Sequence, residues 1–384
     1  MTLAGPTYRV KRNPNFDNLR RSLLRLGPPG PVPIFENGAD PAMVLALTGE
    51  TGRWRSWGLY GGMQTQGEFE SGRHGRDVFN LTLRFCYENG YDYVWAWTGL
   101  VFPRANFHAL QDTAPAENWE GGVRFWQDES SGPIQTWADF ESYPWPKLED
   151  ISYGAVEYFN RFVPDGMKVG VNFFGILENT SWLMGLEPLC YALADDPSLP
   201  AAIFQRVGDL TLAAVDYAAT VDNVGFVVLG DDMGWASSTL LSPAVLRKHV
   251  LPHHARIVNR VHAAGKPIVL HSCGNVLSLM DDFIEIGFDA KHAYEDKIMP
   301  VEDVYRRWGD RISIAGGIDM DILGRGTEEQ VRHRVRQVLE VCAEKGTGYV
   351  LGSGNGLANF IPPQNYLAMA EEGRRWNRDH YGTP

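Results

Sequence analysis

The feature that most constrains the fold is the regular alternation of short β-rich segments with longer segments of helical period. Eight segments have the composition of strands, and these are 32–37, 91–97, 168–175, 225–231, 267–271, 289–294, 312–316 and 349–352. Several of them are continuously apolar, which is typical of strands covered on both faces in a parallel sheet. Eight strand–helix units predict a (β/α)8 TIM barrel, and a doubly wound sheet is the alternative.

Helix signals lie between the later strands. Ser242 followed by Pro243 indicates a helix start, and Gly265 is expected to end that helix after residue 264. Thr327 and Gln330 have the spacing of a capping box and predict a second helix that runs to about residue 345. No Ser/Gly-rich linker divides the chain, so residues 1–384 are predicted to form a single domain.

Residues 102–146 fit this alternation poorly and are rich in aromatic side chains. We predict that they form an insertion after the second strand, with a hairpin over 123–137 that turns at 130–133. Insertions over the mouth of a barrel commonly become lids.

The aromatic side chains of this insertion have two possible roles. They could exclude water from a site and stack on an aromatic substrate, and Trp126 is the candidate substrate contact. Alternatively, they only pack an insertion that has no core of its own. The residues concerned are Trp119, Phe125, Trp126 and Trp137.

Composition excludes several classes of protein. The chain has 35 Lys and Arg against 47 Asp and Glu, a formal net charge of −12, so neither nucleic acid nor a membrane surface is expected as a partner. Four cysteines without a CxxC pair disfavour a disulfide framework. The first residues lack the apolar core of a signal peptide, and no apolar run approaches the ~20 residues of a membrane span. We therefore expect a cytoplasmic protein.

Polar side chains gather where the predicted strands end, which is where a barrel carries its active site. Four of them are candidate substrate contacts: Asn37, Trp97, Asn172 and Asn355. Three others are candidate catalytic residues: Asp232, Glu178 and Tyr294.

The sharpest signal for a metal is His271-x-Cys273 at the end of the fifth predicted strand. Side chains at positions i and i+2 of a strand share a face, so the imidazole and the thiol can converge on one point, and both are zinc ligands. A third ligand is needed, and Glu36, Asp231 or Asp232 could supply a carboxylate oxygen. The alternative is a buried, hydrogen-bonded histidine beside a cysteine that packs as a small apolar side chain.

Asp231 and Asp232 are adjacent, so side chains on a strand would point to opposite faces and only one can enter the barrel. That residue could act as a general acid or base, a metal ligand or a substrate anchor, or it could simply cap a turn.

Two further motifs are not assigned to chemistry. His249, His253 and His254 lie on a predicted outer helix without the glutamate of an HExxH motif, and a partly solvated face is expected there. The glycine-rich segment 352–358 is followed by Pro362 and Pro363 and by no strand ending in an acid, so a dinucleotide loop is rejected in favour of a loop lining the site.

The second half of the chain resembles the uroporphyrinogen decarboxylase-like superfamily. The matching blocks are MGLEPLCYALADDPSLPAAIFQRV (184–207), GDDMG (230–234), LSP (241–243), GKPIVLHSCGN (265–275), IEIGFDA (284–290), WGDRISIAGGID (308–319) and IPPQNYLAM (361–369). The resemblance covers most of the chain from about residue 165 onward.

The resemblance is closer to the corrinoid-dependent methyltransferase branch than to true uroporphyrinogen decarboxylases. The decarboxylases carry an arginine-rich N-terminal signature, whereas this chain has PIFENGADP at 33–41, with the acidic Glu36. The methyltransferases hold zinc through a His-x-Cys pair, which His271 and Cys273 match, and a C-terminal cysteine. Ser353 stands at the position of that cysteine, so the resemblance implies a zinc site completed by a carboxylate, or one that no longer binds metal.

The resemblance implies a methyltransferase that demethylates a small, possibly methoxyaromatic, substrate and passes the methyl group to a corrinoid carried by a partner protein. The bound metal would polarise the atom that carries the methyl group. A carboxy-lyase is the first alternative, although the only cation named near a strand end is Lys291, which precedes a turn. A non-catalytic barrel that captures a corrinoid or tetrapyrrole is the second. A homodimer is expected to be possible.

Overall fold

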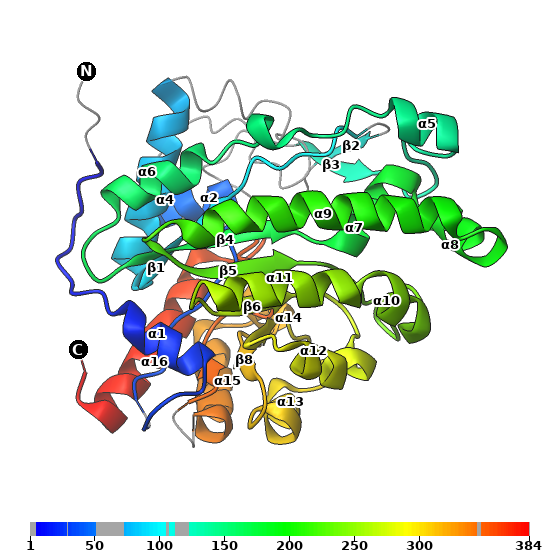
Figure 1. The fold of residues 1–384 in the computed structure, drawn as a ribbon. Coiled ribbons are helices and arrows are strands. Elements are labelled where there is room, and N and C mark those ends of the chain that lie inside the picture. Colours follow the sequence, from blue (N-terminus) through cyan, green and yellow to red (C-terminus); the bar gives the residue numbers. More distant parts are fainter. Residues whose placement is uncertain are drawn as a thin grey trace.

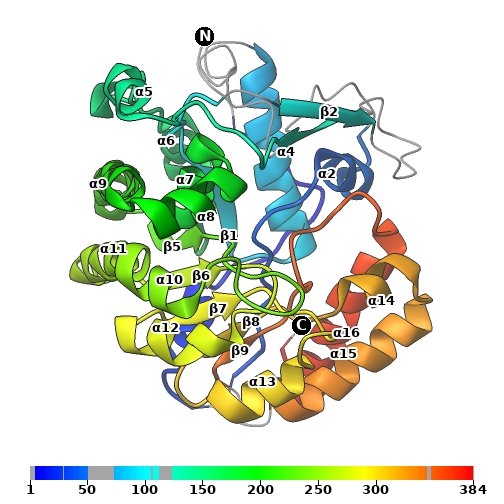
Figure 2. The same cartoon turned by 90° about the vertical axis from the view of Figure 1, so that its right-hand side faces the viewer.

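The core of the molecule is a curled sheet of seven parallel strands surrounded by helices (Figure 1; Figure 2). This computed structural model describes residues 5–28, 30–50, 73–104, 107–111, 123–343 and 347–383. The strand order is β1-β4-β5-β6-β7-β8-β9. Their bounds are β1 (Tyr93–Trp97), β4 (Lys168–Phe174), β5 (Val224–Gly230), β6 (Ile268–His271), β7 (Ala290–His292), β8 (Ser313–Ala315) and β9 (Tyr349–Val350).

Helices follow the strands and form the outer layer. In chain order the described helices are α1 (Phe16–Leu23), α2 (Pro41–Thr48), α4 (Arg73–Asn89), α5 (Trp137–Ser142), α6 (Gly154–Phe162), α7 (Ile176–Met184), α8 (Leu186–Asp195), α9 (Ser198–Thr220), α10 (Pro243–His249), α11 (Leu251–Ala263), α12 (Met280–Ile286), α13 (Val301–Trp308), α14 (Met320–Arg325), α15 (Glu328–Cys342) and α16 (Pro363–Tyr381). Short 3-10 turns lie at Leu148–Asp150 and Leu277–Leu279. Figure 2 shows these helices as a ring around the curled sheet. The helices cover the outer face of the sheet, and side chains of the strands themselves fill its inner face.

The first predicted strand differs from the other seven. Residues 32–37 join β9 through a single parallel bridge, in which the Phe35 amide donates to the Leu351 carbonyl (2.8 Å) and the Leu351 amide donates to the Pro33 carbonyl (2.9 Å). Pro31 and Pro33 have no amide hydrogen to offer a ladder, which explains why a regular strand does not form. The architecture is therefore a curled seven-stranded α/β sheet, consistent with the predicted barrel but with its eighth strand reduced to one bridge.

The gap between residues 32–37 and β1 is closed by a side chain. The Tyr93 hydroxyl accepts a hydrogen bond from the Glu36 amide (2.7 Å) and donates one to the Glu36 carbonyl (2.5 Å). The Tyr93 ring also packs on Phe35, with 5.7 Å between ring centroids. One buried phenol thus satisfies the two backbone groups that a neighbouring strand would otherwise pair.

The helix signals are confirmed in type and corrected in extent. Ser242 caps its helix by accepting from the Val245 amide (3.3 Å), but the predicted helix breaks at Val250 into α10 and α11. Pro252, in the first turn of α11, cannot donate to the preceding turn, and this explains the break. The capping box of Thr327 is present at the start of α15.

The 102–146 segment contains a hairpin, but the predicted one over 123–137 is wrong. β2 (Phe107–Gln111) pairs antiparallel with β3 (Val123–Gln127), so the second strand precedes residue 123 rather than following the turn at 130–133. Residues 137–142 form α5 instead, because Thr136 and Asp139 cap each other's backbone amides. Trp119 lies outside the described residues, as do the side chains of Phe125 and Trp126, so the lid and the Trp126 contact stay predictions.

Candidate metal centre

Three metal-ligating side chains converge at the carboxyl ends of β5 and β6. Asp232 follows β5, His271 is the last residue of β6, and Cys273 comes two residues later; their ligand atoms all lie within 4.8 Å of one another. His271 Nε2 lies 3.5 Å from Cys273 Sγ and 3.9 Å from Asp232 Oδ1. Among the described residues, this is the one cluster with three such groups.

The loops that follow β5 and β6 are bound to each other. Asp232 Oδ1 accepts a hydrogen bond from the Cys273 amide (2.8 Å), and the Ser272 hydroxyl accepts one from the Met233 amide (3.1 Å). The Asn275 amide donates to the Trp235 carbonyl (2.7 Å). The three side chains are therefore held on one braced pair of loops before any ligand arrives, which reduces the entropy lost on binding.

The surroundings favour the uncharged forms of both soft ligands. Burial lowers the pKa of His271, and burial together with the charge of Asp232 raises the pKa of the Cys273 thiol well above its usual range. The Asn355 side-chain amide donates to Cys273 Sγ (3.1 Å). A divalent cation would supply the positive charge that a thiolate lacks here.

The donor set fits a zinc ion. An imidazole nitrogen, a thiol sulfur and a carboxylate oxygen are all zinc ligands, and three protein ligands leave one coordination position open, as in catalytic zinc sites. His271 and Cys273 are the two candidate ligands that the sequence predicted, and the structure brings their ligand atoms together. Asp232, predicted as a catalytic residue and also considered as a third ligand, is the carboxylate that lies with them.

Asp231 lies outside this cluster and anchors a helix. Its fully buried carboxylate accepts the amides of Ile176 (2.9 Å), Leu177 (3.2 Å) and Glu178 (2.9 Å) at the start of α7. Gly175 is required beside it, because a Cβ there would lie 2.2 Å from the Asp231 side chain. The two adjacent aspartates thus point to different places, and the structure gives Asp231 a structural role in place of the predicted one.

The histidines of α10 and α11 correct another expectation. His254 Nε2 contacts Asp231 Oδ2 at 2.7 Å, and both side chains are fully buried. The predicted partly solvated face is therefore wrong at His254. His254 is buried because it pairs with Asp231, and no residue spacing in the sequence reveals that pair.

Glu36 also lies outside the cluster. It is fully buried, and its carboxyl oxygens contact the Ser353 amide (2.8 Å) and the Ser353 hydroxyl (2.5 Å). Burial raises the pKa of Glu36 to about 8. Ser353, which stands where the resemblance places a cysteine ligand, is thereby engaged with Glu36.

Glu178 lies close enough to the cluster for the charge of Asp232 to act on its carboxyl group. Burial and the charges of Asp232 and Asp231 raise its pKa well above the usual range, while the Arg104 guanidinium opposes the rise. A carboxyl group that keeps its proton near neutral pH can act as a general acid.

The strand ends of β1 and β4 contribute amides and aromatic rings. The Asn172 side-chain amide donates to the Asn37 carbonyl (3.1 Å), and the amide oxygens of both side chains are buried without a hydrogen-bond partner among the described residues. Trp97 stacks on Phe174 with 5.0 Å between ring centroids, and Trp182 meets Phe174 edge-on at 5.3 Å. Unpaired buried acceptors beside flat rings are typical of a ligand site.

Of two cations, Arg104 was missed by the strand-end rule, and Lys291 was considered only as a residue that precedes a turn. The Arg104 guanidinium lies 3.3 Å from the centroid of the Trp182 ring, although Arg104 comes seven residues after β1. Lys291 lies within β7, is buried and has its pKa lowered by burial to about 8, with its ammonium 4.3 Å from the Tyr294 ring.

Tyr294 is not brought to the cluster. Its buried hydroxyl has no hydrogen-bond partner among the described residues, and the neighbouring charge that raises its pKa further is that of Cys342 on α15. The side chain therefore faces the outer helical layer.

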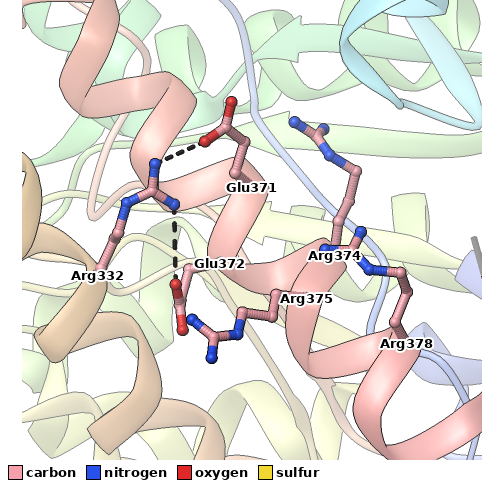
Figure 3. Close-up of a pocket in the computed structure, with 6 residues that line it drawn as sticks. All are labelled: Arg332, Glu371, Glu372, Arg374, Arg375 and Arg378. Atoms are coloured by element: carbon pink, nitrogen blue, oxygen red, sulfur yellow. Dashed lines mark hydrogen bonds and ion pairs between the residues drawn. The ribbon is translucent and has the colours of Figure 1, made fainter.

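A hollow of about 270 Å³ lies on α15 and α16 (Figure 3). Its lining is Arg332, Glu371, Glu372, Arg374, Arg375 and Arg378. Arg332 pairs with Glu371 (2.6 Å) and lies 3.8 Å from Glu372, as the dashed lines of Figure 3 show. None of these residues stands at a strand end, so the candidate site remains at β5 and β6.

Comparison with known proteins decides the family. A family model described as uroporphyrinogen decarboxylase (URO-D) matches residues 123–376. The chain belongs to the uroporphyrinogen decarboxylase family. The match includes Asp232, His271 and Cys273, so the candidate metal centre lies inside the family domain.

Relatives within this family carry two kinds of activity in their names. A methylated-thiol–coenzyme M methyltransferase of Methanosarcina mazei is 28% identical over 245 residues, which is 62% of each chain. A methylcobamide:CoM methyltransferase of Methanosarcina barkeri is 27% identical over 169 residues, 44% of this chain and 47% of the relative. A uroporphyrinogen decarboxylase of Cupriavidus pinatubonensis is 35% identical over 279 residues, 67% of this chain and 74% of the relative. The chain thus spans less than two thirds of either methyltransferase.

The same family fold is found in a solved structure. A methyltransferase from Methanosarcina mazei matches with a TM-score of 0.63 at 15% identity, covering 94% of this chain and 98% of that one. The likeness supports the shared fold and says nothing more specific. Among the described residues of the present chain, no helix is both long and apolar enough to cross a membrane.

Proposed function

We propose that the chain is a methyltransferase that removes the methyl group from a small methylated substrate and passes it to a corrinoid carried by a separate protein. The observation that carries this proposal is the cluster of Asp232, His271 and Cys273 at the strand ends. Two relatives named as methyltransferases support the reaction class, and the name of one of them includes a methylcobamide.

The three clustered side chains would hold a zinc ion. A bound zinc acts as a Lewis acid that weakens the bond between a heteroatom and its methyl group. Asp232 is about one third exposed and His271 about one eighth exposed, so the ligand atoms can be reached from the mouth. The braced loops after β5 and β6 keep these side chains in place, and nearby burial excludes water.

The remaining polar groups would manage the leaving group and the body of the substrate. When the methyl group departs without its bonding electrons, the heteroatom keeps the pair and needs a proton. Burial raises the pKa of Glu178, which favours its protonated form, and we propose that Glu178 supplies this proton. Trp97 and Phe174 would stack on a flat substrate such as a methoxyaromatic compound, and Asn37 and Asn172 offer their unpaired amide oxygens to its donors.

A carboxy-lyase is the second candidate, and one observation favours it. Decarboxylation needs a cation to bind the carboxylate, and the structure places Arg104 beside Glu178 and Trp182. The carboxylate of Asp232 in the same cluster disfavours an anionic substrate. The methyltransferase is therefore preferred.

The test combines metal analysis with two turnover assays. Protein purified without chelator is expected to contain about one zinc per chain, lost in His271→Ala, and to transfer methyl groups from a panel of methylated compounds to reduced cobalamin. Glu295→Gln is the matched control, because Glu295 is an exposed carboxylate beside the cluster that accepts a long, 3.3 Å hydrogen bond from the Gly274 amide. It should keep both metal and activity.

Each other outcome contradicts the proposal in a different way. Release of CO₂ from a porphyrinogen without methyl transfer would assign the carboxy-lyase. Tight binding of a corrinoid with no turnover of any donor would assign a binding barrel. Full methyl transfer after complete removal of metal would leave the methyltransferase and reject the role of the zinc.

A further inference from the structure

Two histidine rings meet behind the candidate metal centre. His271 and His292 are paired residues of β6 and β7, and their Nδ1 atoms lie 2.8 Å apart. At this separation one nitrogen must carry a hydrogen and the other must accept it. The hydrogen bonds at the far end of the pair decide which.

Ser353 sets the direction of the hydrogen bond. His292 Nε2 lies 3.3 Å from the Ser353 carbonyl oxygen, which can only accept. His292 is fully buried, and its hydrogen-bond partners among the described residues include no carboxylate, so its ring is neutral and carries one hydrogen. That hydrogen is on Nε2, and His292 Nδ1 is therefore an acceptor.

The direction then passes to the metal cluster. His271 Nδ1 must donate to His292, so His271 Nε2 carries a lone pair rather than a hydrogen. That lone pair faces Cys273 Sγ at 3.5 Å, and the thiol hydrogen can be donated to it. The Asn355 amide donates to the same sulfur, so the hydrogen bonds run in one direction from Asn355 to Ser353 without a conflict.

The His292 ring is held in the orientation that this requires. Phe35 meets it edge-on with 5.5 Å between ring centroids. On another side, Gly316 approaches so closely that a Cβ there would lie 2.9 Å from Cδ2 and 3.1 Å from Nε2 of His292. Gly316 also has φ +82°, which glycine adopts without strain. The ring cannot turn over without displacing these neighbours.

We propose that His292 is a positioning residue of the metal centre, which holds His271 in the Nδ1–H tautomer and so presents the Nε2 lone pair to the metal. The proposal rests on the zinc site of the proposed function. Groups that orient a histidine ligand in this way typically change metal affinity by 10- to 100-fold when they are removed.

The first test needs no metal. In ¹⁵N-histidine-labelled protein stripped of metal, long-range ¹⁵N–¹H correlation spectra distinguish the two tautomers, and His271→Ala and His292→Asn assign the signals. His271 is expected as the Nδ1–H form and His292 as the Nε2–H form. Observation of His271 as the Nε2–H form would overturn the proposal.

The second test measures Co²⁺ and Zn²⁺ affinity, using the sulfur-to-cobalt absorption band as a signature of Cys273. His292→Phe keeps a ring but loses the acceptor, and a 10- to 100-fold weaker affinity is expected. His292→Asn places an acceptor oxygen near the lost Nδ1 and should restore most of the affinity. Unchanged affinity and absorption in His292→Phe would overturn the proposal.

The two tests separate this inference from the function on which it rests. Wild-type protein that binds neither metal would reject the zinc site, while the tautomers in the metal-free protein still decide the role of His292. Should His292→Phe fail to fold, as judged by its thermal melt, His292→Asn and the wild-type spectra decide between the two outcomes.

Discussion

Glu36 gives the sharpest quantitative prediction. Its carboxyl group is fully buried against Ser353, and burial raises its pKa from 4.5 to about 8. Below pH 4.5 both the folded and the unfolded chain hold the proton, so Glu36 adds no pH dependence there. Between pH 4.5 and 8 the unfolded chain releases the proton and the folded chain keeps it, so the free energy of unfolding falls by about 1.4 kcal/mol per pH unit.

The accumulated effect follows from the width of that interval. A pKa raised from 4.5 to about 8 corresponds to a loss of up to about 5 kcal/mol as the pH rises. Above pH 8 both states are ionised and the loss stops growing. Because whole proteins are stable by only about 5–15 kcal/mol, the effect is measurable.

Glu36→Gln is the informative substitution. The glutamine oxygen can accept from the Ser353 amide, and its amide can donate to the Ser353 hydroxyl, so the contacts of the neutral acid are retained. Urea unfolding at a series of pH values is expected to give equal stabilities near pH 5. By pH 8 to 9 the variant should be more stable by up to about 5 kcal/mol, and zinc binding should be unchanged.

Glu302→Gln is the matched control, because Glu302 contacts Arg334 and its pKa is lowered. Its contribution is present above pH 4.5 and disappears as the pH falls through its folded-state pKa, so this variant should differ from wild type least in acid. Parallel stability curves for wild type and Glu36→Gln between pH 5 and 8 would refute the reasoning. Loss of zinc in Glu36→Gln would instead support the earlier prediction that Glu36 is a metal ligand.

Three other substitutions have separate expected outcomes. Asp232→Asn should weaken Zn²⁺ binding by at least about tenfold in a chelator competition assay, with an unchanged thermal melt. Asp231→Asn should leave Zn²⁺ bound but lower the free energy of unfolding by about 3 kcal/mol in urea, because three helix amides and His254 lose a charged acceptor. Asn355→Leu removes a donor to Cys273 Sγ, and alkylation of the metal-free thiol should slow by about fivefold.

Seven of the eight predicted strands are present. A continuously apolar run between helical segments must be buried on both faces, and a strand of a parallel sheet provides that burial. The segment 32–37 has a similar composition but forms a single bridge. Its prolines do not disturb the pattern of apolar residues from which a strand is predicted. They do remove backbone N–H groups that a regular strand needs for its hydrogen bonds.

The candidate site was predicted where local geometry is sufficient. The i, i+2 rule for strands predicted that His271 and Cys273 converge, and the structure brings them together although β6 ends at His271. The choice between Asp231 and Asp232 depended on contacts with α7 and with His254, which come from distant parts of the chain. Sequence spacing contains no information on such pairings.

The missed groups share a different cause. Arg104 lies in the segment 102–146, outside every predicted strand, and Lys291, considered only as preceding a turn, is buried inside β7 where an apolar residue is the expectation. His292 lies within the predicted strand 289–294 and was not among the candidate site residues. Its direction of hydrogen bonding depends on the Ser353 carbonyl, a backbone group that no residue pattern represents.

The Tyr93 phenol determines how the segment 32–37 is attached to β1. Cylindrical sheets are ordinarily sealed by peptide groups, which no exchange of side chains can remove. Here the seal beside β1 is a hydroxyl group, and Tyr93→Phe would delete it while leaving the ring against Phe35 and Phe226. Glu36 and Asn37 lie on the segment sealed in this way. Tyr93→Phe would therefore leave the Glu36 amide and carbonyl without this partner, and it changes none of the three residues of the candidate metal cluster.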